Sequence, residues 1–204
     1  MSHHYVIQDS VQSEIKERGS RFLGYGKPVT SISAIRDFHQ DLDTQFNDAS
    51  HICYAYRLFV GPRLDEFATD SGEPKGSAGL PILNVLKRAN LVNYAIFVVR
   101  YFGGTKLGIP GLIKTYGTAA ELCLENTKRE LYIPTDVLVV QHGYEQTRIL
   151  ESALKLCGGK ITHQDFGEGI KTRLVIPSKN RRQFTDQIRE LSAGTLTVDQ
   201  ILTV

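Results

Sequence analysis

The sequence is organised around the stretch from Asp70 to Gly117. Within it, residues 94–102 read YAIFVVRYF, a near-continuous apolar run rich in β-branched and aromatic residues. Such a run is typical of a central strand whose two faces are both covered. Eight of the chain's 18 glycines fall inside the stretch, in two clusters that flank the run and that each lead into a helical pattern. We therefore expect the functional site here and scaffold elsewhere.

Composition limits the class of protein. The 204 residues suffice for one large or two small domains, and 41% apolar and 23% charged residues are ordinary for a globular chain. No apolar run approaches the roughly 18 residues of a membrane span, and MSHHYVIQDS lacks the pattern of a secretory signal. We expect a cytosolic protein without membrane contact. A net charge of +2 means that nucleic-acid binding would need a local basic patch.

The three cysteines, Cys53, Cys123 and Cys157, are widely spaced and lie in apolar periodic segments. No Cys-x-x-Cys or Cys/His spacing indicates a zinc site. We interpret them as buried free thiols, and we expect neither a metal nor a cofactor.

The first part of the chain reads as a sheet with helices on it. Ser31 precedes apolar residues at spacings of three and four, which predicts a capped amphipathic helix. Residues 61–69 read as a polar connection. We predict strands over 5–7, 11–15, 22–29, 51–60 and 94–102, and helices from Ser31, over 81–88 and from Pro110.

The pattern changes after Pro134. We predict a strand over 136–143, a helix over 145–157, a hairpin of 160–166 with 170–176, a helix from a Ser178 cap to Leu191 and a last strand over 195–204. This βαββαβ order is that of the ferredoxin-like fold. The sequence thus predicts an α+β protein of two domains, residues 1–134 and 135–204.

The two glycine clusters share the spacing G-x-x-x-G-x-x-G. Each contains a lysine, Lys75 or Lys106, and each precedes a helix start, where free amides favour an anion such as phosphate. Neither matches a P-loop or a dinucleotide-binding pattern. Two interpretations stand: anion-binding loops, or plain tight turns. The shared positions are Gly72, Gly76 and Gly79 in the first cluster, and Gly104, Gly108 and Gly111 in the second.

Two acidic residues lie in the first cluster. Asp70 and Glu73 could act as a general base or bind a cation. Alternatively, Asp70 and Ser71 cap a turn through nearby amides, which we favour for Asp70.

Two further residues carry possible chemistry. His51 precedes a strand and is, with Glu73, a candidate base, although a lone histidine is more often structural. Arg100 stands inside the apolar strand, where a charge must be paired or face a site. With the aromatic Tyr101 and Phe102 beside it, it could serve stacking and phosphate contact together, or it could form a buried ion pair with Asp70 or Glu73.

Basic residues also gather near the C-terminus. We interpret these residues as a solvated helix face, and the alternative is a patch that contacts a nucleic-acid backbone. They are Lys179, Arg181, Arg182 and Arg189.

Three separated blocks resemble the IMPACT family, in particular its YigZ-like bacterial branch. They are His51-x-Cys53-x-Ala55, the run DSGEPKGSAG (70–79) with Pro81, and the run VVRYFGGTKLG (98–108) with Gly111, Leu112 and Tyr116. The motifs cover roughly residues 50–120. Pro110 and Thr115 depart from the small residue and the alanine usual in the family, and Pro110 stiffens the second loop.

The resemblance implies a first domain like the second domain of small-subunit ribosomal protein five. It implies a second domain similar to domain five of elongation factor G. Eukaryotic relatives regulate translation by binding an activator of an amino-acid-starvation kinase with the help of a further domain that this sequence does not contain. The resemblance therefore implies a role tied to translation rather than that particular partner.

Three functional hypotheses follow. The first is RNA or ribosome binding through the glycine loops; the second is an enzyme acting on a phosphorylated small molecule; the third is a regulator that docks a protein partner in translation control. Fold analogy alone does not choose among them. The candidate binding residues are Asp70, Gly72, Glu73, Lys75, Gly76, Arg100, Tyr101, Gly103, Gly104, Lys106 and Gly108.

Overall fold

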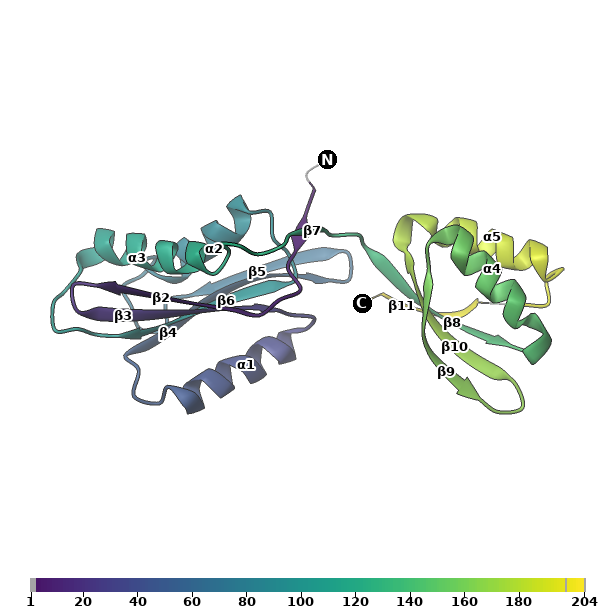
Figure 1. Cartoon of the computed structure of the whole chain (residues 1–204), viewed down its shortest axis with the longest axis horizontal. Coiled ribbons are helices and arrows are strands. Elements are labelled where there is room, and N and C mark those ends of the chain that lie inside the picture. The colour runs from purple at the N-terminus through teal and green to yellow at the C-terminus, as the bar shows by residue number, and fades with distance from the viewer. Residues whose placement is uncertain (1–2, 197, 204) are drawn as a thin grey trace. The chain divides into compact units, whose positions relative to one another are not determined.

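The computed structural model describes residues 3–196 and 198–203. It divides the chain into two compact units, Met1–Tyr132 and Ile133–Val204, drawn in Figure 1. Both units combine antiparallel sheets with helices, which confirms the predicted α+β, two-domain fold class. Within the described residues, no helix is both long and apolar enough for a membrane span.

The first unit is a five-stranded antiparallel sheet in the order β2-β3-β6-β4-β5. Helix α1 lies on one face, and helices α2 and α3 lie on the other (Figure 1). Strand β6 is central and buried along most of its length, as the apolar run predicts. The elements are β2 (Val11–Glu17), β3 (Ser20–Pro28), α1 (Ile32–Gln45), β4 (His51–Val60), β5 (Arg63–Thr69), α2 (Gly79–Arg88), β6 (Tyr94–Tyr101) and α3 (Gly108–Leu122).

Local sequence signals account for several element boundaries. The hydroxyl of Ser31 accepts a hydrogen bond from the amide of Ala34 at 3.1 Å, which confirms the predicted cap of α1. A short ladder of β1 (Tyr5–Val6) and β7 (Glu130–Leu131) joins the two ends of this unit. The three cysteines are buried free thiols, as expected.

The prediction of a polar connection over residues 61–69 was wrong, because the segment contains edge strand β5. Its register with β4 is unbroken, and Asp65 accepts a hydrogen bond from the hydroxyl of Tyr56 at 3.0 Å. Glu66 pairs with Arg57 at 2.9 Å and with Lys87 at 2.5 Å. An edge strand exposes one side to water, so it can be polar enough to look like a loop.

The second unit is a four-stranded antiparallel sheet in the order β11-β8-β10-β9 with two helices on one face. This is the predicted βαββαβ arrangement. The predicted Ser178 cap was wrong, because the hydroxyl of Ser178 donates to Asp136 at 2.7 Å and the α-helix starts later. The elements are β8 (Thr135–His142), α4 (Thr147–Cys157), β9 (Lys160–Phe166), β10 (Ile170–Pro177), α5 (Arg181–Leu191) and β11 (Val198–Thr203), with short 3-10 turns at Tyr144–Gln146 and Ser178–Asn180.

A backbone contact between two glycines fixes the start of the second glycine loop. The hairpin between β2 and β3 turns at Gly19, and Gly103 lies directly against it. A Cβ atom on Gly103 would stand 1.8 Å from the carbonyl carbon of Gly19. The amide of Gly103 also donates to the hydroxyl of Ser20 at 3.1 Å.

We predict opposite effects for two glycine substitutions. Gly103→Ala should destabilise the first unit by about 2 kcal/mol or more, because the neighbouring backbone must move. Gly117→Ala should stabilise it by about 1 kcal/mol, since Gly117 lies inside α3 with open space around it and alanine favours helix. Urea denaturation followed by circular dichroism measures both. Equal stability of the two variants would contradict the glycine contact.

Candidate functional site

The first glycine loop folds around the carboxylate of Asp70. It accepts hydrogen bonds from the backbone amides of Gly76, Ala78 and Gly79 at 2.7, 3.0 and 2.8 Å. Because α2 starts at Gly79, this carboxylate occupies the position where a helix start binds an anion. The capping interpretation of Asp70 is confirmed, and this anion position is filled from within the chain.

The electrostatics of Asp70 follow from these contacts. Partial burial acts to raise the pKa of its carboxyl group, but the three amide hydrogen bonds outweigh burial and hold the pKa below its ordinary value. Asp70 is therefore a structural anion at neutral pH. It stabilises the loop and is poorly suited to accept a proton.

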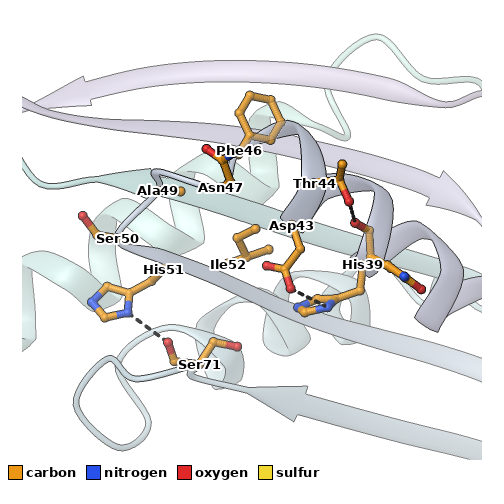
Figure 2. A pocket seen from close by; sticks show the side chains of 11 residues that line it. His39, Asp43, Thr44, Phe46, Asn47, Ala49, Ser50, His51, Ile52 and Ser71 are labelled. Carbon is orange, nitrogen blue, oxygen red and sulfur yellow. Dashed lines mark hydrogen bonds and ion pairs between the residues drawn. The ribbon is translucent and has the colours of Figure 1, made fainter.

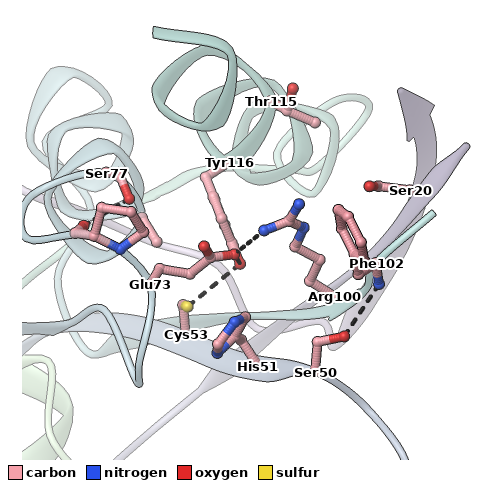
Figure 3. A network of polar contacts seen from close by, with 12 residues as sticks. Ser20, Ser50, His51, Cys53, Glu73, Ser77, Arg100, Phe102, Thr115 and Tyr116 are labelled. Atoms are coloured by element: carbon pink, nitrogen blue, oxygen red, sulfur yellow. Dashed lines mark hydrogen bonds and ion pairs between the residues drawn. The ribbon is translucent and has the colours of Figure 1, made fainter. Parts of the chain in front are cut away.

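Glu73 and Arg100 form a buried ion pair. Arg100 Nη1 lies 2.5 Å from Glu73 Oε1, and the two side chains are only 7% and 3% exposed. The same oxygen accepts a hydrogen bond from the hydroxyl of Tyr116 at 2.8 Å. The thiol of Cys53 lies 3.4 Å from that hydroxyl (Figure 3). Of the alternatives considered for Arg100, the structure shows the ion pair, with Glu73 rather than Asp70.

Burial keeps the neighbouring thiol and phenol protonated. It raises the pKa of the Cys53 thiol to about 12 and also raises the pKa of Tyr116. Cys53 is therefore not a thiolate nucleophile at neutral pH. Both groups act as hydrogen-bond donors within the network.

His51 lies beside this network on the neighbouring strand, in register with Arg100. Its Nδ1 is 2.9 Å from the carbonyl oxygen of Ser71. Because a carbonyl only accepts, Nδ1 is the donor in this contact. The structure thus brings His51, Glu73 and Arg100 together. Lys106 is not part of this cluster, because it lies on the exposed second loop.

A polar hollow of 590 Å³ lies on the other side of His51, between α1 and the start of β4 (Figure 2). Apart from Ser71, its lining comes from residues 39–52, and the sequence did not indicate this hollow because that stretch carries no recognisable binding motif. His39 in its wall pairs with Asp43 at 4.0 Å. Its lining also includes Asn47 and Ser50.

Of the two aromatic residues that follow Arg100 in the sequence, Phe102 rather than Tyr101 lies beside it. Side chains alternate along β6, so Tyr101 points to the α1 face and its hydroxyl donates to Asp48 at 2.8 Å. Of the two aromatic residues expected beside Arg100, Phe102 is confirmed in that position and the expectation for Tyr101 was wrong. Phe102 is 49% exposed, and the Arg100 guanidinium carbon lies 5.6 Å from the centre of its ring.

The second glycine loop differs from the first despite their common spacing. Lys106 is exposed, and the N-cap residue of α3, Leu107, has an apolar side chain that makes no capping hydrogen bond. Gly104 and Gly108 have φ angles of +85° and +70°, which glycine adopts without strain. The carboxylate of Asp70 thus occupies the anion position at the start of α2. The N-cap residue of α3 provides no such side-chain acceptor. Lys75 and Gly72 lie exposed on the first loop.

Among residues 3–196 and 198–203, no group of three or more His, Cys, Asp or Glu side chains is arranged to hold a metal ion.

Comparison with known proteins gives the family. The Impact N-terminal domain matches residues 18–124, just over half of the chain and including both glycine loops and the buried network. The chain therefore belongs to the IMPACT family.

Relatives of similar length support this membership. The chain is 29% identical to the IMPACT family member YigZ of Escherichia coli, over 92% of this chain and 91% of that protein. It is 28% identical to the IMPACT family member YvyE of Bacillus subtilis, over 94% and 88%. A crystal structure described as that of a hypothetical protein superimposes with a TM-score of 0.70 at 27% identity, covering 100% of this chain and 98% of the other.

We predict that Asp70→Asn costs about 1–3 kcal/mol of unfolding free energy at neutral pH, because it weakens hydrogen bonds to a charged acceptor. The pKa of Asp70 is lower in the folded than in the unfolded state. Its contribution is therefore complete above the ordinary value of 3.8 and is lost as the pH falls through the folded-state pKa.

Urea denaturation at pH 7 and at about pH 3 tests this prediction. The difference between the natural protein and Asp70→Asn should shrink at the lower pH. Asp37→Asn, which changes an exposed carboxylate on α1, is the matched control and should be near neutral. A difference that is constant with pH would contradict the assigned role.

Proposed function

We propose that this chain is a translation-related regulatory protein of the cytosol that binds RNA, free or within the ribosome, through the loop between β6 and α3. Membership of the IMPACT family supports the link to translation. The sequence makes both glycine loops candidates for the phosphate site. In the first loop, Asp70 already accepts the amide hydrogen bonds at the start of α2, so we favour the second loop.

The observation that carries the proposal is the composition and exposure of residues 102–108. An exposed aromatic, Phe102, directly follows the central strand and precedes two glycines and the exposed Lys106. Aromatic rings stack on unpaired bases, and lysines contact phosphates. The amides at the start of α3 add favourable polarity for an anion.

Each residue has a distinct part in this proposal. Phe102 stacks on a base, and Lys106 binds the adjacent phosphate. Gly104, whose Cβ position faces open space, lets the backbone approach the strand of RNA closely. Arg100 makes a cation–π contact with Phe102, with its guanidinium carbon 5.6 Å from the ring centre.

An enzyme acting on a phosphorylated small molecule has less support. Glu73 Oε1 already accepts hydrogen bonds from Arg100 and Tyr116, and Cys53 is protonated. Of the two candidate bases, this leaves His51. Lys106, which this hypothesis needs beside the base, lies on the exposed loop.

A protein-docking role has one specific observation in its favour. A groove of 480 Å³ runs between α2 and α3 and is lined by the exposed side chains of Leu80 and Ile113. Exposed apolar side chains beside a groove are typical of contact surfaces. This surface is compatible with a translation regulator that binds both RNA and a protein partner.

We predict that Lys106→Ala weakens binding of labelled single-stranded RNA and lowers the slope of log affinity against log salt by about one, because one phosphate contact is lost. Phe102→Leu should weaken binding by about 1–3 kcal/mol with little change in salt slope, since stacking carries no net charge. Fluorescence polarisation at several salt concentrations measures both effects.

Lys155→Ala is the matched control, because it removes an exposed lysine from α4 in the second unit. It should leave the affinity nearly unchanged. Loss of affinity in Lys155→Ala equal to that in Lys106→Ala would indicate nonspecific charge attraction. Absence of RNA binding at micromolar protein would reject the proposed function.

A further inference from the structure

Glu73 is an unusual member of the first glycine loop, because its side chain points inward while the loop around it is exposed. Gly72, Pro74 and Lys75 are all exposed, yet the Glu73 side chain is only 3% exposed. A surface loop thus inserts a carboxylate into the protein and places it on Arg100 (Figure 3). Removing both charges from water carries a large desolvation cost, so the ion pair is weak evidence for a purely stabilising role.

Glu73 does not satisfy all the donors of Arg100. The Nη1 atom pairs with Glu73, but Nε is buried and has no hydrogen-bond partner among the described residues. A buried donor without an acceptor costs free energy. The arginine is therefore able to bind an anion that places one acceptor oxygen at Nη1 and a second at Nε.

We propose that Glu73 is an internal anion that blocks Arg100, and that a phosphate group of bound RNA displaces it from that arginine. This inference rests on the proposed function and adds a regulatory step to it. A phosphodiester has the same single negative charge as the carboxylate and presents oxygens that a guanidinium binds through two parallel hydrogen bonds. The hydroxyl of Tyr116, which now donates to Glu73, can donate to the incoming oxygen as well.

The contacts of the first glycine loop allow segment 71–75 to move while α2 stays folded. Asp70 bonds the amides of Gly76, Ala78 and Gly79, which clamps both ends of segment 71–75. Ser71, Gly72 and Gly76 have φ angles of +42°, +92° and +76°, so the segment turns sharply at each end. Withdrawal of Glu73 breaks its amide bond to the Asp70 carbonyl at 2.9 Å but leaves the three carboxylate bonds in place.

The blocked arginine lies next to the proposed RNA loop. Arg100 and Phe102 are neighbours on the same face of the sheet, with the guanidinium carbon 5.6 Å from the ring centre. A base stacked on Phe102 would bring its own phosphate near Arg100. Release of Glu73 would thus extend the RNA contact from Lys106 and Phe102 to a second cation.

The test is a polarisation titration of single-stranded RNA with Glu73→Gln. We expect affinity to rise about tenfold, the size of one charge-assisted hydrogen bond to phosphate, and the salt slope to steepen by about one. The gain should vanish in Glu73→Gln/Arg100→Gln. Asp48→Asn is the charge-matched control, because Asp48 contacts Tyr101 and not Arg100; it should change affinity less than about twofold.

A second variant separates displacement from a change in net charge. Glu73→Asp keeps the charge but shortens the side chain by one methylene, so its pairing with Arg100 weakens. It should also bind RNA more tightly than the natural protein, which keeps the proposal testable if Glu73→Gln fails to fold. Unchanged affinity in Glu73→Asp, with Lys106→Ala still weakened, would overturn the inference and leave the proposed function standing.

Inorganic phosphate tests the anion position without RNA. Thermal denaturation of Glu73→Asp and Glu73→Gln, in phosphate and in chloride of equal ionic strength, should show a phosphate-specific rise in Tm. That rise should be lost when Arg100→Gln is added. No phosphate-specific rise in any folded Glu73 variant would overturn the inference, whereas a rise without RNA binding would reject only the proposed function and the RNA source of the phosphate.

Discussion

The covering of both faces of the first sheet is the constraint on which the rest of this unit depends. Because α1 lies on one face and α2 and α3 lie on the other, strand β6 must be apolar on both sides. A charge on β6 is tolerated only at its end, where Arg100 meets a carboxylate. The location of the polar network therefore follows from the layering, and the two glycine loops gather there because they leave and enter the same end of the sheet.

Sequence reasoning succeeded where a signal is local. Ser31 is followed by an amphipathic pattern, and Asp70 lies within a few residues of the amides that it caps, so both roles could be inferred from nearby residues. The order of strands and helices in the second unit was also readable, since each element carries its own period. Edge strand β5 was missed because Glu66 and its neighbours are polar and their ion-pair partners lie elsewhere in the chain.

Contacts between distant segments were harder to predict. The sequence left Asp70 and Glu73 as equal partners for Arg100, because only the folded loop decides which carboxylate reaches inward. Tyr101 was placed with Arg100 although strict alternation along the strand separates them, so that error had an available signal. The sequence did not predict that the two glycine loops differ, since their glycine spacing is the same. They differ because Asp70 binds the amides at the start of α2.

The contact between Gly19 and Gly103 has a consequence for attempts to transplant the second loop. The loop rests on the hairpin through main-chain atoms, with no side chain between them. A graft of residues 102–108 alone onto another scaffold would therefore lose the contact with the hairpin that fixes the position of the loop. The hairpin tip and the loop form one transferable part, and a chimaera that exchanges them together should retain the loop's geometry.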